Sequence, residues 1–290
     1  MALNLKIRDL WQEGYRALQF SSRPDLEARL LLEKACSWTS QQILLNLDLP
    51  CPASLARRYR RLIKKRKMGC PMALITGQKE FWSLPLKVER GVFIPRPETE
   101  VLVELVLKLP WKKDGLVADI GTGCGAIACA LARERPEARI MATDISRRAL
   151  RLARENASCL NLKNINFMLG SLFKALEPLG PENKFDLIVS NPPYVAEGQW
   201  SSLPADIRNY ESKRALVAGP TGLEFIFQLI QGAPAFLRPG GFLAFEFGLG
   251  QLEPILAFLE DRGWQEVIWE KDLAGIPRAL AARLKPDSKS

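Results

Sequence analysis

Histidine does not occur anywhere in the 290 residues of this chain. Its absence excludes Ser–His and Cys–His nucleophile pairs, the commonest basis of hydrolase chemistry. Cysteines are present but form no Cys-x-x-Cys pair, so we expect neither a zinc site nor a disulfide framework, and no metal; reduced thiols are the default. The cysteines are Cys36, Cys51, Cys70, Cys124, Cys129 and Cys159.

Long apolar runs and Walker-type phosphate loops are also missing from the sequence. No run approaches the ~20 apolar residues that cross a bilayer, and no G-x-x-x-x-G-K-[ST] motif occurs, which excludes a P-loop nucleotidase. The stretch from Met1 to Asp9 is charged and lacks an apolar segment, so we expect no secretory signal. Asp9 and Glu13 also argue against a mitochondrial transit peptide. We therefore expect a cytoplasmic protein.

Positive charge is concentrated in the first third of the chain. Residues 1–90 carry 17 of the 41 Lys+Arg and 8 of the 32 Asp+Glu, which leaves 24 of each sign for the remainder. The first 90 residues therefore hold the whole net charge of +9, and such a shift in composition indicates a separate module. Much of it falls in one amphipathic stretch, either a solvated helix face or a docking surface for an acidic macromolecule or RNA. Its cations are Arg57, Arg58, Arg60, Arg61, Lys64, Lys65, Arg66 and Lys67.

The hydrophobic pattern divides the chain into three parts. Residues 1–72 show helical periodicity with turn punctuation, which predicts a small bundle of short helices, and we expect this basic bundle to dock the substrate. Residues 73–95, including Leu74–Gly77, alternate in polarity and predict a β-hairpin linker. Residues 96–286 alternate strands and helices, which predicts a doubly wound, mostly parallel, Rossmann-like α/β sheet. The expected strands are 116–120, 139–143, 165–169, 185–190, 241–247 and 264–269, and the expected helices begin near Pro97, Ala126, Arg147, Leu223 and Leu252.

A glycine-rich turn follows the first of these strands. Asp119 and Ile120 lead into Gly121-Thr122-Gly123-Cys124-Gly125, where glycines on alternate positions let the backbone turn tightly and approach a ligand. The spacing differs from the dinucleotide motif G-x-G-x-x-G. Asp144 ends the next strand, at the position of the acid that holds ribose hydroxyls in doubly wound folds. An alternative role for Asp144 is the N-cap of the following helix.

Asn191-Pro192-Pro193-Tyr194 follows the apolar strand 185–190. Proline has no backbone N–H, so this segment offers carbonyl acceptors, to which Asn191 adds a side-chain oxygen and Tyr194 a flat ring. At the carboxyl end of a parallel strand, where open α/β sheets bind ligands, such a corner suits a planar NH2 group. The order of glycine loop, acid and tetrad is that of S-adenosylmethionine-dependent amino-methyltransferases.

Across nearly its whole length the chain resembles one family, the protein-(glutamine-N5) methyltransferases of peptide chain release factors. Pro95-Arg96-Pro97-Glu98-Thr99-Glu100 is the most specific of the stretches that carry the resemblance. Related ribosomal-protein glutamine methyltransferases differ there, and DNA adenine methyltransferases lack it. The other stretches are Leu74–Phe81, Phe93–Glu100, Arg208–Glu211, Gly240–Glu246 and Lys271–Gly275.

The resemblance implies methyl transfer from S-adenosyl-L-methionine to the glutamine side chain of the Gly-Gly-Gln motif of a release factor, which modulates translation termination. It places the residues from Gly121 to Gly125 beside the methionine part of the cofactor and Asp144 at its ribose. By the same resemblance we expect Ser171 and Leu172 near the adenine and Asn191 facing both cofactor and substrate. Ser171 stands where the family usually has an acid, and Cys124 where a serine is common.

The residues suggest how an amide nitrogen is methylated without a strong base. Asn191 and the Pro192 carbonyl accept the two N–H hydrogens while Tyr194 and Phe93 sandwich the amide plane, so that positioning supplies most of the rate. The surplus proton leaves to water. We also expect Arg96 to contact the substrate side of the site and to pair with Glu246.

Two alternatives use the same pocket. A DNA or RNA adenine-N6 methyltransferase also needs a site for a planar NH2 group, on a flipped base, and a ribosomal-protein glutamine is a second possible acceptor. Direct nucleic-acid binding is not required by the first interpretation. A non-catalytic module that binds a release factor is disfavoured by the intact Gly121, Gly123, Asp144 and Asn191. We expect a monomer that does not associate with membranes.

Overall fold

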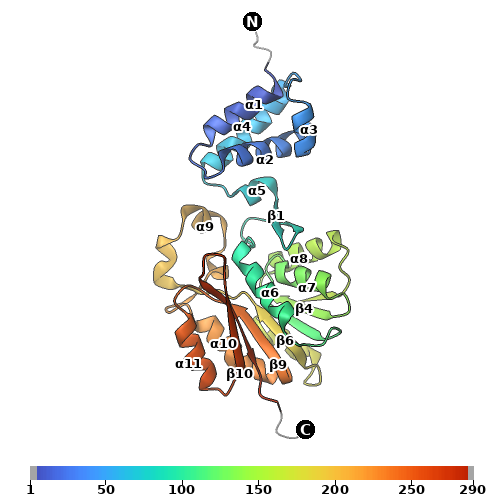
Figure 1. The fold of residues 1–290 in the computed structure, drawn as a ribbon, viewed down its shortest axis with the longest axis vertical. Helices are drawn as coiled ribbons and strands as arrows, with labels where there is room; N and C mark the ends of the chain where they lie inside the picture. Colours follow the sequence, from blue (N-terminus) through green and yellow to red (C-terminus); the bar gives the residue numbers. More distant parts are fainter. Residues whose placement is uncertain (1–4, 287–290) are drawn as a thin grey trace. The chain divides into compact units, whose positions relative to one another are not determined.

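The computed structural model describes residues 5–286 and divides the chain into two compact units, Met1–Gln78 and Lys79–Ser290. The first unit is a helical bundle (Figure 1). Its helices are α1 (Ile7–Ala17), α2 (Pro24–Cys36), α3 (Ser40–Leu45), α4 (Ala53–Lys67) and α5 (Met72–Thr76). The expectation for Met1 to Asp9 lies partly outside the described residues.

The bundle forms because each helix turns an apolar stripe inward. Leu10 of α1, Leu31 of α2 and Tyr59 of α4 are fully buried in one cluster, and the Tyr59 hydroxyl donates to the carbonyl of Ala28 at 3.1 Å. At the start of α3, Thr39 and Gln42 form a reciprocal capping box, which satisfies two backbone N–H groups. The bundle is thus a small domain with its own hydrophobic core.

The β-hairpin begins later than the alternating pattern suggested. Leu74 to Thr76 belong to the short helix α5, which starts after Pro71 and ends at Gly77, where φ is 81°. Proline fits the start of a helix and glycine its left-handed end, so these two residues outweigh the alternation. The hairpin consists of β1 (Gln78–Phe81) and β2 (Leu84–Lys87), joined by Trp82 and Ser83, which both have positive φ.

The second unit contains a seven-stranded sheet with the order β10-β11-β9-β6-β3-β4-β5. The pairs from β9 to β5 are parallel, and β11 runs antiparallel to both of its neighbours. The strands are β3 (Leu116–Ile120), β4 (Arg139–Asp144), β5 (Ile165–Leu169), β6 (Phe185–Ser190), β9 (Leu237–Glu246), β10 (Gln265–Lys271) and β11 (Pro277–Arg283). This architecture confirms the doubly wound, mostly parallel Rossmann-like sheet.

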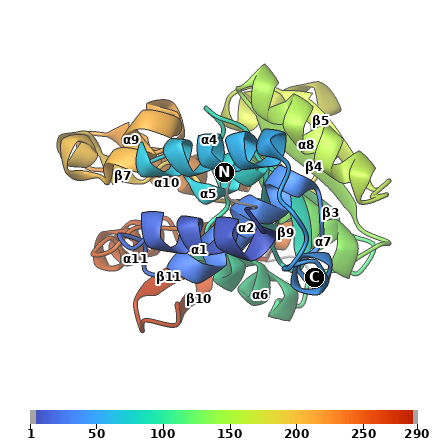
Figure 2. The ribbon, with the colours of Figure 1, turned by 90° about the horizontal axis from the view of Figure 1, so that it is seen from above.

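Helices cover both faces of this sheet (Figure 1). One face packs on α6 (Glu100–Lys108), α7 (Ala126–Glu134) and α8 (Arg147–Cys159), and the other on α10 (Glu224–Gly232) and α11 (Leu252–Glu260). Every residue of β3 and β6 is buried, as expected for parallel strands covered on both sides. The segment with β7 (Val195–Ala196), α9 (Ala205–Tyr210) and β8 (Val217–Gly219) lies on the opposite side of this unit from β5 and α8 (Figures 1 and 2).

Strand β11 was not expected from the sequence. It begins with Pro277, and its run of alanines and Leu280 has helical rather than strand propensity. In the fold, residues 279–282 are completely buried between β9 and β10 and contribute alternately to the two cores. Small side chains suit this crowded place, and pairing on both edges overrides local preference.

The ends of the central strands are aligned at one edge of the sheet. Ile120 pairs with Thr143 on one side and with Ser190 on the other, and Asp144 pairs with Leu169. Chain order runs outward from β3 in both directions, so this edge is a topological switch point, where ligands bind in open α/β sheets. Among residues 5–286, no helix is long and apolar enough to span a bilayer.

Candidate active site

The glycine loop connects β3 to α7 at the switch point. Gly121, Gly123 and Gly125 all have positive φ, at 74°, 59° and 86°, a backbone region that favours glycine. A Cβ added to Gly121 or Gly123 would meet no heavy atom within 4 Å, whereas one on Gly125 would lie 3.0 Å from the Cβ of Ala153 in α8. The first two glycines therefore leave backbone accessible to a ligand, and the third allows close helix packing.

Asp119 lies beneath this loop and is fully buried. Its Oδ2 accepts from the Thr122 hydroxyl at 2.6 Å and from the Ala128 amide at 3.2 Å, while Oδ1 has no hydrogen-bond partner among the described residues. Burial raises the pKa of Asp119 to about 7, although both hydrogen bonds act in the opposite direction. An unpartnered carboxylate oxygen beside a glycine loop is typical of a binding site.

Asp144 joins the glycine loop to the end of β4. Its two oxygens accept from the amides of Gly123, at 2.9 Å, and Ser146, at 2.7 Å. Ser146 rather than Asp144 caps helix α8, since its hydroxyl accepts from the Ala149 amide, so the N-cap alternative for Asp144 is wrong. Burial raises the pKa of Asp144. The acid is thus held against the loop, with acceptor capacity left over.

Asn191 follows β6, next to the glycine loop. The preceding residue, Ser190, donates to the carbonyl of Ile120 at 2.7 Å and ties the two strand ends together. The Asn191 amide donates through Nδ2 to the Thr99 hydroxyl at 3.0 Å. Its Oδ1 receives no hydrogen bond within residues 5–286 and remains an available acceptor. Pro192 is buried, and Pro193 is partly buried.

Tyr194 is held at both ends. Its hydroxyl donates to Oε1 of Glu246 at 2.9 Å, and its backbone carbonyl accepts from the Gln251 side chain at 2.9 Å. Burial raises the pKa of the phenol, and the neighbouring Glu246 acts in the same direction. Tyr194 is therefore a neutral, immobilised ring rather than a proton carrier.

Arg96 does not pair with Glu246, as the sequence suggested. It forms an ion pair with Glu211, whose other oxygen accepts from the Ile94 amide at 3.2 Å. Its guanidinium also lies 5.2 Å from the centre of the Phe93 ring. Glu246 is 1% exposed and forms no ion pair with the described residues, so the predicted pairing of Arg96 with Glu246 is wrong. The Arg208–Glu211 stretch instead clamps the segment that carries Phe93.

Ser171 and Leu172 follow β5, beside the end of β4. The Gly170 amide donates to the Asp144 carbonyl at 3.1 Å, so the start of this segment lies beside Asp144. Ser171 is exposed and Leu172 is partly buried, with φ at 48°. The structure therefore gathers the glycine loop, Asp144, Ser171, Leu172 and the tetrad at one sheet edge, and Thr99 joins the Phe93–Arg96 segment to Asn191.

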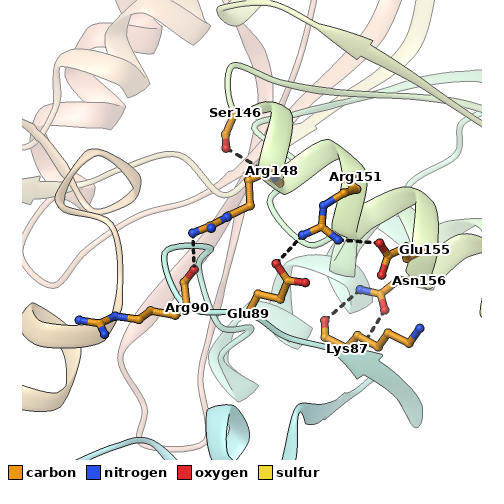
Figure 3. A network of polar contacts seen from close by, with 9 residues as sticks. Lys87, Glu89, Arg90, Ser146, Arg148, Arg151, Glu155 and Asn156 are labelled. Carbon is orange, nitrogen blue, oxygen red and sulfur yellow. Dashed lines mark hydrogen bonds and ion pairs between the residues drawn. The ribbon is translucent and has the colours of Figure 1, made fainter.

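Sequence reasoning missed one residue that supports the loop, Asn156 of α8. This buried amide accepts from the Lys87 amide at 2.8 Å and donates to the carbonyls of Lys87 and Cys124, at 3.1 and 2.9 Å. Around it, Arg151 pairs with Glu89, and Arg148 donates to the Arg90 carbonyl (Figure 3). An asparagine inside an otherwise apolar helical stripe was the only available signal.

The site fits S-adenosyl-L-methionine. It combines open backbone at Gly121 and Gly123, an orphaned buried oxygen on Asp119 and the strand-end acid Asp144. The free acceptor of Asn191 lies at the next strand end. Fold and site together define the class of Rossmann-like, S-adenosylmethionine-dependent methyltransferases.

Comparisons with known proteins identify the family within this class. A family model described as "Methyltransferase small domain" matches residues 89–219, and one described as "PrmC N-terminal domain" matches residues 9–77. The release factor glutamine methyltransferase of Vibrio cholerae is 41% identical over 100% of this chain and 98% of its own length. That of Coxiella burnetii is 40% identical over 91% of this chain and 93% of its own. The chain belongs to the release factor glutamine methyltransferase family.

A solved structure supports the fold alone. A methyltransferase from Pyrococcus furiosus superposes with a TM-score of 0.52 at 20% identity and covers 79% of this chain and 99% of that one. Membership of the release factor glutamine methyltransferase family makes the chain a methyltransferase, and this class implies S-adenosyl-L-methionine as methyl donor. Neither alternative that the sequence left open, adenine or a ribosomal-protein glutamine, appears in the names of these two relatives.

Proposed function

We propose that this protein methylates the side-chain amide nitrogen, N5, of the glutamine in the Gly-Gly-Gln motif of peptide chain release factors, and so modulates translation termination. The observation that carries the proposal is the orientation of Asn191. Its Nδ2 is engaged by Thr99 and its Oδ1 is free, which leaves an acceptor for a planar NH2 group at the switch point of the sheet. The names of the curated relatives support this substrate.

The cofactor is held by residues from three strand ends. The residues from Gly121 to Gly125 border the methionine part, and their open backbone permits close approach. Asp144 accepts hydrogen bonds from the ribose hydroxyls, since its carboxylate retains free lone pairs. Ser171 and Leu172 adjoin the adenine, where the single hydroxyl of Ser171 offers one hydrogen bond. When bound, the cofactor supplies an electrophilic methyl group.

The chain's own residues position the acceptor nitrogen. An amide nitrogen is a weak nucleophile because its lone pair is delocalised into the carbonyl. Oδ1 of Asn191 and the Pro192 carbonyl accept its two hydrogens, and Tyr194 and Phe93 hold the amide plane from its two sides. These contacts orient the lone pair and stabilise positive charge on nitrogen as it develops. No residue with the basicity of histidine is needed, because the proton leaves to water after transfer.

The helical unit supplies a docking surface for the release factor. We define the cationic face of α4 as Arg57, Arg58, Arg61, Lys64, Lys65 and Lys67, which are exposed and form no ion pair with residues 5–286. Like charges at helical spacing destabilise a helix, so a face with no acid on it fits an acidic partner. We assign residues 1–72 to docking, 73–95 to the linker, 96–286 to catalysis, and a monomer in the cytoplasm as the working state.

The test is methyl transfer from labelled S-adenosylmethionine to purified release factor, ribosomal protein and DNA. Label should appear in the release factor alone and disappear when its motif glutamine is replaced by alanine. Asn191→Ala should reduce kcat by about 10³-fold, an effect of lost positioning, while cofactor affinity measured by calorimetry stays near that of the wild type. Retained turnover in Asn191→Ala, or label in DNA, would overturn the proposal.

A further inference from the structure

The two prolines of the tetrad cannot fix their own position. Neither Pro192 nor Pro193 has a backbone N–H to donate, and the Pro192 carbonyl accepts no hydrogen bond from the residues that the structure describes. In the proposed function this carbonyl has to stay free for the acceptor nitrogen. The place of Pro192 therefore depends on how the residues on either side of the two prolines are held.

The two ends of the tetrad are held differently. Upstream, Ser190 ends the buried strand β6, and its hydroxyl donates to the carbonyl of Ile120 in β3. Downstream, Tyr194 lies outside the seven-stranded sheet and is only partly buried. The bond from its hydroxyl to Glu246 fixes the ring rather than the backbone. The backbone of Tyr194 is therefore held by other contacts.

The side chain of Gln251 holds this backbone. Its Nε2 donates to the Tyr194 carbonyl at 2.9 Å and to the Gly222 carbonyl at 3.2 Å, and its Oε1 accepts from the Gly248 amide at 2.8 Å. A flipped Gln251 amide would face like groups at all three places, so its partners fix its orientation. A Cβ on Gly222, where φ is 84°, would lie 2.5 Å from the Tyr194 carbonyl oxygen, so only glycine permits this close approach.

Gln251 connects the tetrad to a rigid element of the fold. It directly precedes α11, whose Ile255 and Leu259 are completely buried in the core. By contrast, the next backbone bond, from the Val195 amide to the Leu216 carbonyl at 2.9 Å, leads only into the two-stranded sheet of β7 and β8. Because helices hold functional groups in place better than loops do, the bond from Gln251 is the firmer of the two.

We propose that Gln251 is a positioning residue for methyl transfer, which sets the place of the Pro192 carbonyl by holding the carbonyl of Tyr194. The inference rests on the proposed function, in which Pro192 accepts a hydrogen from the acceptor nitrogen. Gln251 itself touches neither the substrate nor the cofactor. A misplacement of about 1 Å at a reacting group can cost roughly 100-fold in rate, so the loss of this hold should appear in kcat.

The experiment compares Gln251→Glu with Gln251→Met. An ionised glutamate still accepts from Gly248 but has no hydrogen for Tyr194, and methionine lacks both groups. Where the glutamate is ionised, both variants should lower kcat by about 10- to 100-fold, the range for an unpaired buried carbonyl. The cofactor affinity and the KM for the release factor should change little, because Gln251 contacts no cofactor residue and a release factor binds through far more than one amide. Wild-type kcat in Gln251→Glu would overturn the proposal.

A pH profile separates positioning from general damage to the site. Once the glutamate of Gln251→Glu takes up a proton, it can again donate one hydrogen to a carbonyl. The ratio of its kcat to that of the wild type should therefore rise as the pH falls through the pKa of this glutamate. The same ratio for Gln251→Met should stay constant, because methionine does not titrate. A ratio for Gln251→Glu that does not rise would contradict the proposal.

The matched control loosens the same neighbourhood without touching Tyr194. Thr221 precedes Gly222, and its hydroxyl donates to Glu224 at 2.9 Å and accepts from the Leu223 amide at 3.2 Å. Thr221→Ala removes both bonds and should keep the wild-type kcat. An equal loss of kcat in Thr221→Ala and Gln251→Met would assign the effect to the turn at Gly222 and refute the positioning role.

NMR of the intact enzyme follows the Tyr194 carbonyl without turnover. Tyr194-Val195 is the only Tyr-Val pair in the sequence, so carbonyl-13C tyrosine combined with 15N valine gives a single cross-peak for this peptide bond. Loss of the hydrogen bond should move its 13C resonance to lower frequency in Gln251→Met and leave it unchanged in Thr221→Ala. An unchanged resonance in Gln251→Met would show that Gln251 does not hold Tyr194.

The outcomes separate this inference from the proposed function. If the wild-type enzyme methylates no release factor, the proposed function fails, whatever the variants do, and the NMR measurement still tests the hold on Tyr194. If the wild type methylates release factor and Gln251→Glu matches it in kcat, the function stands and the positioning role is refuted.

Discussion

Replacement of Arg96 by methionine should loosen the segment that carries Phe93. The side chain of Glu211 is 1% exposed, and its ion pair with Arg96 is the principal compensation for its burial. Removing one partner of a buried pair typically costs about 3–5 kcal/mol. Arg96 itself is 30% exposed, so water can reach the gap, and we expect a cost of about 2 kcal/mol.

Protonation of Glu211 limits the loss of stability in Arg96→Met. Burial raises the pKa of Glu211, while Arg96 and the Ile94 amide lower it. Without Arg96 the pKa rises further, so the acid of the variant takes up a proton as the pH falls and the uncompensated charge disappears. The destabilisation of Arg96→Met should therefore be largest above the raised pKa and shrink as the pH falls through it.

The assay is hydrogen exchange at the Ile94 amide, which donates to Glu211. A loss of about 2 kcal/mol corresponds to roughly 30-fold faster exchange when local closing is fast relative to chemical exchange, because the exchange rate then follows the equilibrium between closed and open states. The double variant Arg96→Met/Glu211→Gln serves as the control, because glutamine is neutral and still accepts from Ile94. It should recover most of the protection. Unchanged exchange in Arg96→Met, or no recovery in the double variant, would refute the reasoning.

Three further predictions concern other parts of the chain. Asn156→Ala removes the hydrogen bond to the Cys124 carbonyl in the glycine loop. Because this loop borders the cofactor, the affinity for the cofactor, measured by calorimetry, should fall by about 10-fold, the effect of one lost buried hydrogen bond. The Asp119 pKa of about 7 means that the folded state keeps a proton that the unfolded state loses near pH 4, so stability should fall by up to about 4 kcal/mol between pH 4 and 7. In Asp119→Asn, urea unfolding should lose that share of the pH dependence. Charge reversal of Arg57 and Arg61 should raise the KM for release factor, most strongly at low salt, and leave kcat unchanged.

A different result would refute each of these three predictions. Wild-type cofactor affinity in Asn156→Ala would remove that residue from loop support. If the stability of Asp119→Asn depends on pH in the same way as that of the wild type, Asp119 is ionised in the folded state across pH 4 to 7, and the prediction fails. For the cationic face of α4, the matched control reverses two exposed lysines of the second unit, Lys112 and Lys113. An equal rise in KM in that control would indicate net charge rather than docking.

The sequence by itself determined the parts of this protein that depend on neighbouring residues. The buried parallel strands are continuous apolar runs, and strands 116–120, 165–169 and 185–190 occur at the expected residues. Since each strand must end before a turn, the positions of the glycine loop, Asp144 and Asn191 at strand ends followed from the same local pattern. The parallel order then placed them at one edge.

Only the tertiary structure decided which side chains meet. The bond between Asn191 and Thr99 joins residues 92 positions apart, and the pair of Arg96 and Glu211 spans 115 positions. No local pattern distinguishes Glu211 from Glu246 as the partner of Arg96, because the choice depends on which acid lies beside the entering segment. Strand β11 follows the same logic, since its alanines become a strand only between two others. Local sequence thus determines which donors, acceptors and charges each residue has, and tertiary packing determines which residue it contacts.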